Sequence, residues 1–218
     1  MVSVHRLGKQ CAAWKTWNVI LCCCMVGKEG FELRKLEAGS FENNCYLLIC
    51  PETREAIIID PAADAEMILN ASKGLTIKCI LVTHGHVDHI GALKTVKKAT
   101  QAPVGIHASD ARALPSPPDF HLNDGDVIHF GTCAVTIIHT PGHTPGGVCM
   151  LIGKSLISGD TIFPGGPGNT EIPGANRNQI LKSIKEKLFI LPGDTMIYPG
   201  HGLESTIDKE RNSSYYDG

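Results

Sequence analysis

Four side chains of types that commonly bind metal ions lie within six residues of this sequence. The segment from Thr83 to Gly91 reads T-H-G-H-V-D-H-I-G and contains His84, His86, Asp88 and His89. Imidazole and carboxylate groups are ligands that borderline divalent ions such as zinc prefer. A single histidine is more often structural, but four such residues this close together favour a metal site. In a turn, His84 and His86 can project to one side while Asp88 and His89 reach another, so the segment could supply parts of two adjacent sites.

Three more ligand-type side chains follow predicted strands elsewhere in the chain. His143 lies in T-P-G-H-T-P-G-G, Asp160 in S-G-D-T, and His201 in P-G-H-G. Each is flanked by glycine, which lets the backbone adopt positive φ and pass close to a site. Structural zinc sites favour closed shells of four ligands that are rich in cysteine. A set of histidines and aspartates without cysteine therefore indicates an open, catalytic site, with a purely structural zinc protein as the alternative.

The predicted elements would bring these positions to one edge of the fold. An antiparallel meander is expected first, and a buried strand over residues 76–82 then ends directly before Thr83. A helix is predicted to open at Asp60-Pro61, with Asp60 as its cap, and to close at Gly74. Strands are expected at 31–37, 44–50, 54–60, 103–107, 126–131, 132–140, 148–153, 154–159 and 194–200, and helices at 89–101 and 176–191. This order indicates stacked sheets with helices outside, in an α/β or α+β architecture.

The H-x-H-x-D-H signature and the three later motifs resemble the metallo-β-lactamase superfamily over about residues 31–203. The resemblance implies a four-layer αββα sandwich with metals at one edge of the two sheets. It also implies two divalent ions, with Zn²⁺ preferred and Fe²⁺ or Mn²⁺ as alternatives. One ion would be held by His84, His86 and His143, the other by Asp88, His89 and His201, with Asp160 as the bridge. Asp88 would also act catalytically, by orienting the nucleophile.

The contexts of the last three ligands are most similar to the small glyoxalase II-like branch of that superfamily. This similarity implies a hydrolase that cleaves a small thioester or related acyl ester with a metal-bridging hydroxide. Full-length glyoxalase II carries a C-terminal helical domain, which we expect to be missing because the sequence ends about seventeen residues after His201. Relatives that act on glutathione conjugates often have arginine where Asn169 stands, and a neutral side chain cannot form a bidentate pair with a carboxylate.

Asn169 and Arg177 are the candidate substrate contacts near this loop. The alternatives are a plain surface loop for Asn169 and a solvated charge on a helix face for Arg177.

Other members of the superfamily provide alternative functions. Persulfide dioxygenases use a single iron, which the resemblance would assign to His84, His143 and Asp160. Lactone hydrolysis is a further option within the superfamily. Flavodiiron proteins represent a different class, but they usually have a glutamate where His86 stands and are fused to a flavin domain.

Composition favours one globular domain that acts on a small molecule. The 218 residues are 43% hydrophobic, and 20 basic side chains stand against 22 acidic ones. This balance gives no electrostatic reason to expect nucleic acid or an anionic membrane as partner. No apolar run approaches the roughly 20 residues that cross a bilayer. The expected partner is thus a small acyl or thioester substrate, and nothing in the sequence indicates an oligomeric state.

The two ends of the chain differ from its centre. Residues 1–30 are interpreted as a leader or disordered extension, residues 31–203 as the domain, and residues 204–218 as a C-terminal tail. The last residues of this tail, 212–218, are polar and expected to be frayed. Cysteines in the leader are Cys11, Cys22, Cys23 and Cys24, while those expected as reduced core residues are Cys45, Cys50, Cys79, Cys133 and Cys149. Reduced thiols favour a cytoplasmic, intracellular location. Structural roles are expected for His107, His121, His129 and His139.

Overall fold

The first half of the chain forms a mixed sheet whose helices lie on its outer face. The computed structural model describes residues 25–26, 30–39 and 42–216. Within these, the sheet has seven strands: β1 (Met25–Val26), β2 (Glu32–Ala38), β3 (Asn43–Ile49), β4 (Glu55–Ile59), β5 (Thr76–Leu81), β6 (Val104–Ile106) and β7 (Phe120–His121). The predicted meander is antiparallel through β4, and β4 to β7 then pair in parallel. Parallel neighbours need crossovers, which α1 (Ala65–Ala71), α2 (Val87–Ile90) and α3 (Leu93–Thr100) help to provide.

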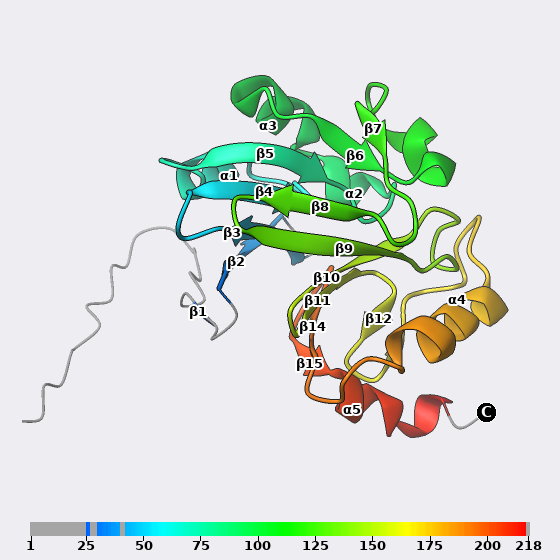
Figure 1. The fold of residues 1–218 in the computed structure, drawn as a ribbon. Helices are drawn as coiled ribbons and strands as arrows, with labels where there is room; N and C mark the ends of the chain where they lie inside the picture. Colours follow the sequence, from blue (N-terminus) through cyan, green and yellow to red (C-terminus); the bar gives the residue numbers. More distant parts are fainter. Residues whose placement is uncertain (1–24, 27–29, 40–41, 217–218) are drawn as a thin grey trace, which may run out of the picture.

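The second half forms a second sheet with its own helices on the opposite outer face. Its strand order in the described chain is β15 (Ser205–Thr206), β14 (Met196–Pro199), β11 (Ser155–Gly159), β10 (Val148–Ile152), β9 (Cys133–His139) and β8 (Val127–Phe130). The strands β12 (Ile162–Phe163) and β13 (Gly166–Pro167) form a small separate ribbon. Helices α4 (Arg177–Ser183) and α5 (Ile207–Arg211) lie beyond this sheet, as Figure 1 shows.

The apolar core is divided into three layers, which gives the four-layer sandwich. Strand β3 illustrates the division because all seven of its residues are buried. Tyr46 and Leu48 face the second sheet, whereas Leu47 and Ile49 face the helices α1 and α3. A third cluster, which includes Ile180 from α4, joins the second sheet to its helices. The predicted αββα architecture is confirmed.

Several predicted element boundaries are wrong for reasons that involve long-range contacts. The first helix begins at Ala65 rather than at Asp60-Pro61, and Asp60 has a positive φ of 49°. Its carboxylate accepts hydrogen bonds from Thr83, far along the chain, so it does not cap a helix. The helix predicted over 89–101 is divided, because the Ala92 amide donates to the carbonyls of Pro61 and Ala62. The helix predicted over 176–191 ends in a π-helical turn at Ile184–Leu188.

The segment expected as a C-terminal tail packs on the domain over residues 205–216, and the expectation of frayed last residues is wrong for 212–216. Strand β15 pairs with β14, and α5 follows it. Ile207 and Tyr216 are buried in the third core cluster. Most of the predicted leader lies outside the described residues, including its cysteines. Met25–Val26 pairs with β2.

The described residues include no helix that is both long enough and apolar enough to cross a membrane.

Candidate metal centre

The loop after β5 is fixed to its own sheet by a buried aspartate that sequence reasoning missed. The Asp60 carboxylate accepts hydrogen bonds from the Thr83 amide at 2.7 Å and from the Thr83 hydroxyl at 2.6 Å. It also lies 3.0 Å from Nδ1 of His89, and both side chains are almost fully buried. A carboxylate can only accept in this contact, so Nδ1 carries the proton and Nε2 faces the cluster. The only sequence signal was an aspartate directly after a predicted strand.

A first group of donor atoms comes from His84, His86 and His143, whose ligand atoms all lie within 4.8 Å of one another. Nε2 of His143 is 2.9 Å from Nδ1 of His86. Nδ1 of His143 donates to the carbonyl of Asn169 at 2.8 Å, because a carbonyl can only accept. This bond turns Nε2 of His143 toward the other two rings. Nε2 of His84 is buried and has no hydrogen-bond partner.

A second group comes from Asp88, His89 and His201, again with ligand atoms within 4.8 Å. The two Nε2 atoms of His89 and His201 are 3.3 Å apart, and Nε2 of His201 is 3.4 Å from Oδ2 of Asp88. Asn43 donates to the same carboxylate oxygen at 3.1 Å, so it holds Asp88 in place. Sequence reasoning missed Asn43, which belongs to β3 and forms a bridge with His201 across the two sheets.

Asp160 lies between the two groups. Its Oδ1 is 3.4 Å from Nε2 of His89, and its Oδ2 is 3.5 Å from Nε2 of His143 and 3.6 Å from Nε2 of His201. Oδ1 is buried without a hydrogen-bond partner. Buried polar atoms are nearly always paired in folded proteins. Two unpaired lone-pair atoms inside a dense imidazole and carboxylate cluster therefore fit divalent metal ions, and the seven predicted ligand residues are all brought together here.

The electrostatics of the cluster are those of a cation site. Burial lowers the pKa of His84 and of His86, so both rings are neutral and their lone pairs are available. Burial also opposes a charge on His89, yet the neighbouring carboxylates of Asp160 and Asp60 raise the pKa of that ring to about 10. Hydrogen bonding to His201 lowers the pKa of Asp88. The carboxylates thus stay ionised and attract positive charge, which a metal ion can supply in place of protons.

A second missed aspartate joins loops of the two halves. Asp110, 7% exposed, lies in the 3₁₀ turn Ala108–Ala113. Its carboxylate accepts hydrogen bonds from the Gly85 amide at 3.0 Å, the Thr144 hydroxyl at 2.6 Å and the Gly146 amide at 2.8 Å. One side chain therefore positions both the loop with His84 and His86 and the loop with His143. Its sequence context gave no signal for this role.

A hollow of about 510 Å³ opens beside Asp160 and His201. Asn169 lines it, as predicted for a substrate contact, whereas Arg177 is not among its lining residues and instead bonds to Tyr215. The rest of the lining is mainly apolar and comes from Phe163, Pro164, Pro167 and Tyr215.

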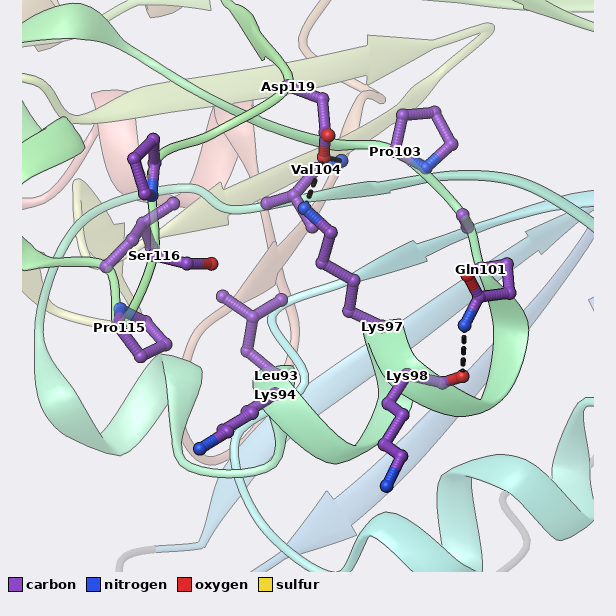
Figure 2. A pocket seen from close by; sticks show the side chains of 13 residues that line it. Leu93, Lys94, Lys97, Lys98, Gln101, Pro103, Val104, Pro115, Ser116 and Asp119 are labelled. Carbon is purple, nitrogen blue, oxygen red and sulfur yellow. Dashed lines mark hydrogen bonds and ion pairs between the residues drawn. The ribbon is translucent and has the colours of Figure 1, made fainter.

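Another hollow, of about 410 Å³, lies between α3 and residues 114–119. Figure 2 shows its polar feature, an ion pair between Lys97 and Asp119 at 2.6 Å. Among the described residues, its lining contains no histidine or cysteine, whereas the hollow beside Asp160 includes two residues of the cluster, Asp160 and His201.

The other histidines of the described residues do not join the cluster. The rings of His107 and His139 are stacked, with centroids 4.0 Å apart. Nε2 of His139 donates to the carbonyl of Pro145, so it supports the loop that carries His143.

Comparison with known proteins places these features in a family context. The model of the metallo-beta-lactamase superfamily matches residues 38–201. An uncharacterized protein of Aquifex aeolicus is 37% identical over 204 residues, which cover 85% of this chain and 97% of that protein. Hydroxyacylglutathione hydrolase GloC of Haemophilus influenzae is 32% identical over 80% of this chain and 92% of its own length. Human mitochondrial persulfide dioxygenase ETHE1 is 36% identical over 180 residues, which cover 76% of this chain and 68% of that protein.

Solved structures agree with the fold. BLEG-1, described as a B3 metallo-beta-lactamase, has a TM-score of 0.80 and 32% identity, and the match covers 85% of this chain and all 100% of that one. The structure of TTHA1623 in a di-iron-bound form has a TM-score of 0.72 and 33% identity, with coverage of 82% and 97%.

Proposed function

Because the chain belongs to the metallo-beta-lactamase superfamily, we propose that it is a metal-dependent hydrolase that cleaves a small thioester or a related acyl ester. The observation that carries the proposal is the arrangement of two donor groups around one shared carboxylate, Asp160. Such an arrangement suits two divalent ions, and the mainly apolar hollow beside it suits an organic substrate.

The residues divide into two sets for this role. His84, His86 and His143 would hold one ion, Asp88, His89 and His201 the other, with Asp160 shared between them. Bound divalent ions supply a water molecule of lowered pKa and polarise a carbonyl group. Asn43 of β3 holds Asp88 in place by a hydrogen bond, and Asp88 would orient the attacking water. His89 is held by Asp60 and His143 by the Asn169 carbonyl, so both rings present Nε2 without rearrangement.

Two relatives point to different chemistries for this shared scaffold. The similarity to GloC supports thioester hydrolysis of the glyoxalase II type. The similarity to ETHE1 supports a second candidate, a mononuclear iron dioxygenase that would use His84, His143 and Asp160. Zinc is the preferred ion in our proposal, with iron and manganese as alternatives, since a related chain has been solved with two irons. The cysteines of the described residues are free and buried, which supports a cytoplasmic location.

Metal analysis of the purified full chain, combined with a thioester panel, tests the proposal. We expect about two divalent ions per chain and hydrolysis of at least one thioester of a small thiol. The ions should be removed by a chelator, and activity should return when zinc, iron or manganese is added back. A single iron per chain, together with oxygen consumption on glutathione persulfide and no thioester hydrolysis, would replace the hydrolase with the dioxygenase.

A further inference from the structure

The C-terminal segment, expected as a loose tail, is anchored firmly enough to form part of a binding site. Tyr216 is buried, and its ring packs against Phe189 with centroids 5.0 Å apart. Glu210, which is 1% exposed, accepts a hydrogen bond from the Gly165 amide at 2.7 Å. It also accepts one from the Ser205 hydroxyl. The segment is therefore joined both to the core and to the loop that follows Asp160.

Tyr215 uses this anchorage to face the hollow beside the metal cluster. Its neighbour Tyr216 points into the core, whereas Tyr215 lines the same hollow as Asp160 and His201. Nη1 of Arg177 donates to the phenol oxygen at 2.7 Å, and the guanidinium carbon is 5.3 Å from the ring centroid. An aromatic side chain held in one position offers contact area at low entropic cost.

The surroundings of this ring favour an uncharged partner. Phe163, Pro164 and Pro167 form much of the remaining lining, which includes no lysine or arginine within the part of the chain described here. A lining of this kind suits an uncharged, apolar group of a substrate.

We infer that Tyr215, held by Arg177, is a specificity-determining residue that binds an apolar or aromatic acyl group of an uncharged thioester or ester. The inference rests on the proposed hydrolase function. It assigns Arg177 a different role from the substrate contact expected from the sequence, because this guanidinium positions the aromatic ring. It also predicts that a highly charged thiol carrier brings no advantage, since no cationic side chain lines the hollow to receive its carboxylates.

The experiment compares two acyl groups on one uncharged thiol. The metal-loaded full chain is assayed with the acetyl and phenylacetyl thioesters of N-acetylcysteamine, and the ratio of their kcat/KM values is measured. The wild-type ratio should favour phenylacetyl by about 3- to 10-fold, the range expected for one aromatic contact. Tyr215→Ala should bring the ratio close to one, while Tyr215→Phe should keep most of it because the ring remains. Arg177→Gln, which frees the ring, should give an intermediate ratio.

The ratio cancels any general loss of turnover, and Ile190→Ala is the matched control. Ile190 is an exposed apolar residue, 76% exposed, of the same C-terminal half, and its removal should leave the ratio unchanged. An unchanged ratio in Tyr215→Ala would overturn the inference. A kcat/KM more than about 10-fold higher for the glutathione thioester than for the N-acetylcysteamine thioester would also overturn it, because such a preference exceeds what one aromatic contact contributes.

A binding measurement separates this inference from the proposed function. If the wild type hydrolyses none of these thioesters, the hydrolase proposal fails, and the site is judged by saturation-transfer NMR with phenylacetate and acetate. A phenylacetate signal that is lost in Tyr215→Ala and kept in Tyr215→Phe would support the aromatic site. Equal signals in the wild type and Tyr215→Ala would refute it.

Discussion

The two halves of the sandwich supply their metal-ligating side chains in different ways. The first half presents His84, His86, Asp88 and His89 on one continuous segment after β5, formed by a loop and the start of α2. The second half supplies His143, Asp160 and His201 from three separate loops. The continuous segment is held mainly by Asp60 of its own sheet, whereas the separate loops depend on contacts across the molecule. Half of the site can thus be organised locally, and the other half requires the finished fold.

The largest effect is expected where the two halves share one residue. Asp160→Ala removes the carboxylate that lies between both donor groups, so the bound metal should decrease and turnover should fall on the order of 10³-fold. Metal analysis and steady-state kinetics with a thioester measure both. Asp194→Asn is the control, since Asp194 is an exposed aspartate that pairs with Lys154 at the surface. Retention of metal and turnover in Asp160→Ala would show that the halves are independent.

The next largest effect should come from the residue that fastens the loops of the two halves together. Asp110→Ala leaves the amides of Gly85 and Gly146 without an acceptor in a buried environment. At about 1–3 kcal/mol for each of these two unsatisfied groups, the free energy of unfolding should fall by about 2–6 kcal/mol. Urea denaturation of the metal-free protein measures this change. The exposed Asp208 serves as control through Asp208→Asn. Equal free energies of unfolding for the two variants would show that Asp110 does not hold the two loops together.

A smaller effect should be confined to the first half. Asp60→Asn keeps the shape of the side chain but weakens its hold on Thr83 and His89, so metal affinity should fall by about 10- to 100-fold. Competition with a coloured chelator measures the affinity. Asp64→Asn, in the same connection between β4 and α1, should leave it unchanged because the Asp64 carboxylate accepts its hydrogen bond from the Gly39 amide, away from the cluster. If metal affinity survived in Asp60→Asn, the loop would be organised without its sheet.

The smallest effect is expected in the second hollow, away from both halves of the cluster. Lys97→Ala breaks the ion pair with Asp119, which is partly exposed and should contribute about 0.2–1 kcal/mol. Turnover should not change. The hydrogen bond from Lys97 lowers the pKa of Asp119 in the folded state, so this contribution is present above the ordinary carboxyl pKa and is lost as the pH falls. The stability difference between wild type and variant should accordingly shrink on acidification, and urea denaturation near neutral and at acid pH checks this.

The sequence predicts the local half of the site better than the distributed half. Contiguous ligands such as His84 and His86 can be recognised from spacing alone, and the sandwich follows from the order of apolar segments. Asp60 and Asp110 could not be found in this way, because their partners lie 23 and 25 residues away or more. A carboxylate between two apolar segments looks the same whether it caps a helix or holds a loop.

The prediction for the C-terminal segment is wrong for a related reason. Its polar composition indicates a tail, but two buried side chains, Ile207 and Tyr216, are enough to attach it to the third core cluster. Local hydrophobicity does not reveal that a surface elsewhere in the fold is shaped to receive them. The break in the predicted helix at Ala92 was missed for the same reason, because the Ala92 amide donates hydrogen bonds to two carbonyls of another segment.

Strand β3 has a further consequence for how the protein opens. Its residues are buried on both faces and lie between two paired neighbours, so their amide protons should exchange with solvent only when the whole domain unfolds. Amides of the ligand loops, by contrast, can exchange through local openings. The exchange rate of the Leu47 amide would therefore report the free energy of global unfolding. The exchange rate of the Gly146 amide would report how far bound metal suppresses local opening of the ligand loops.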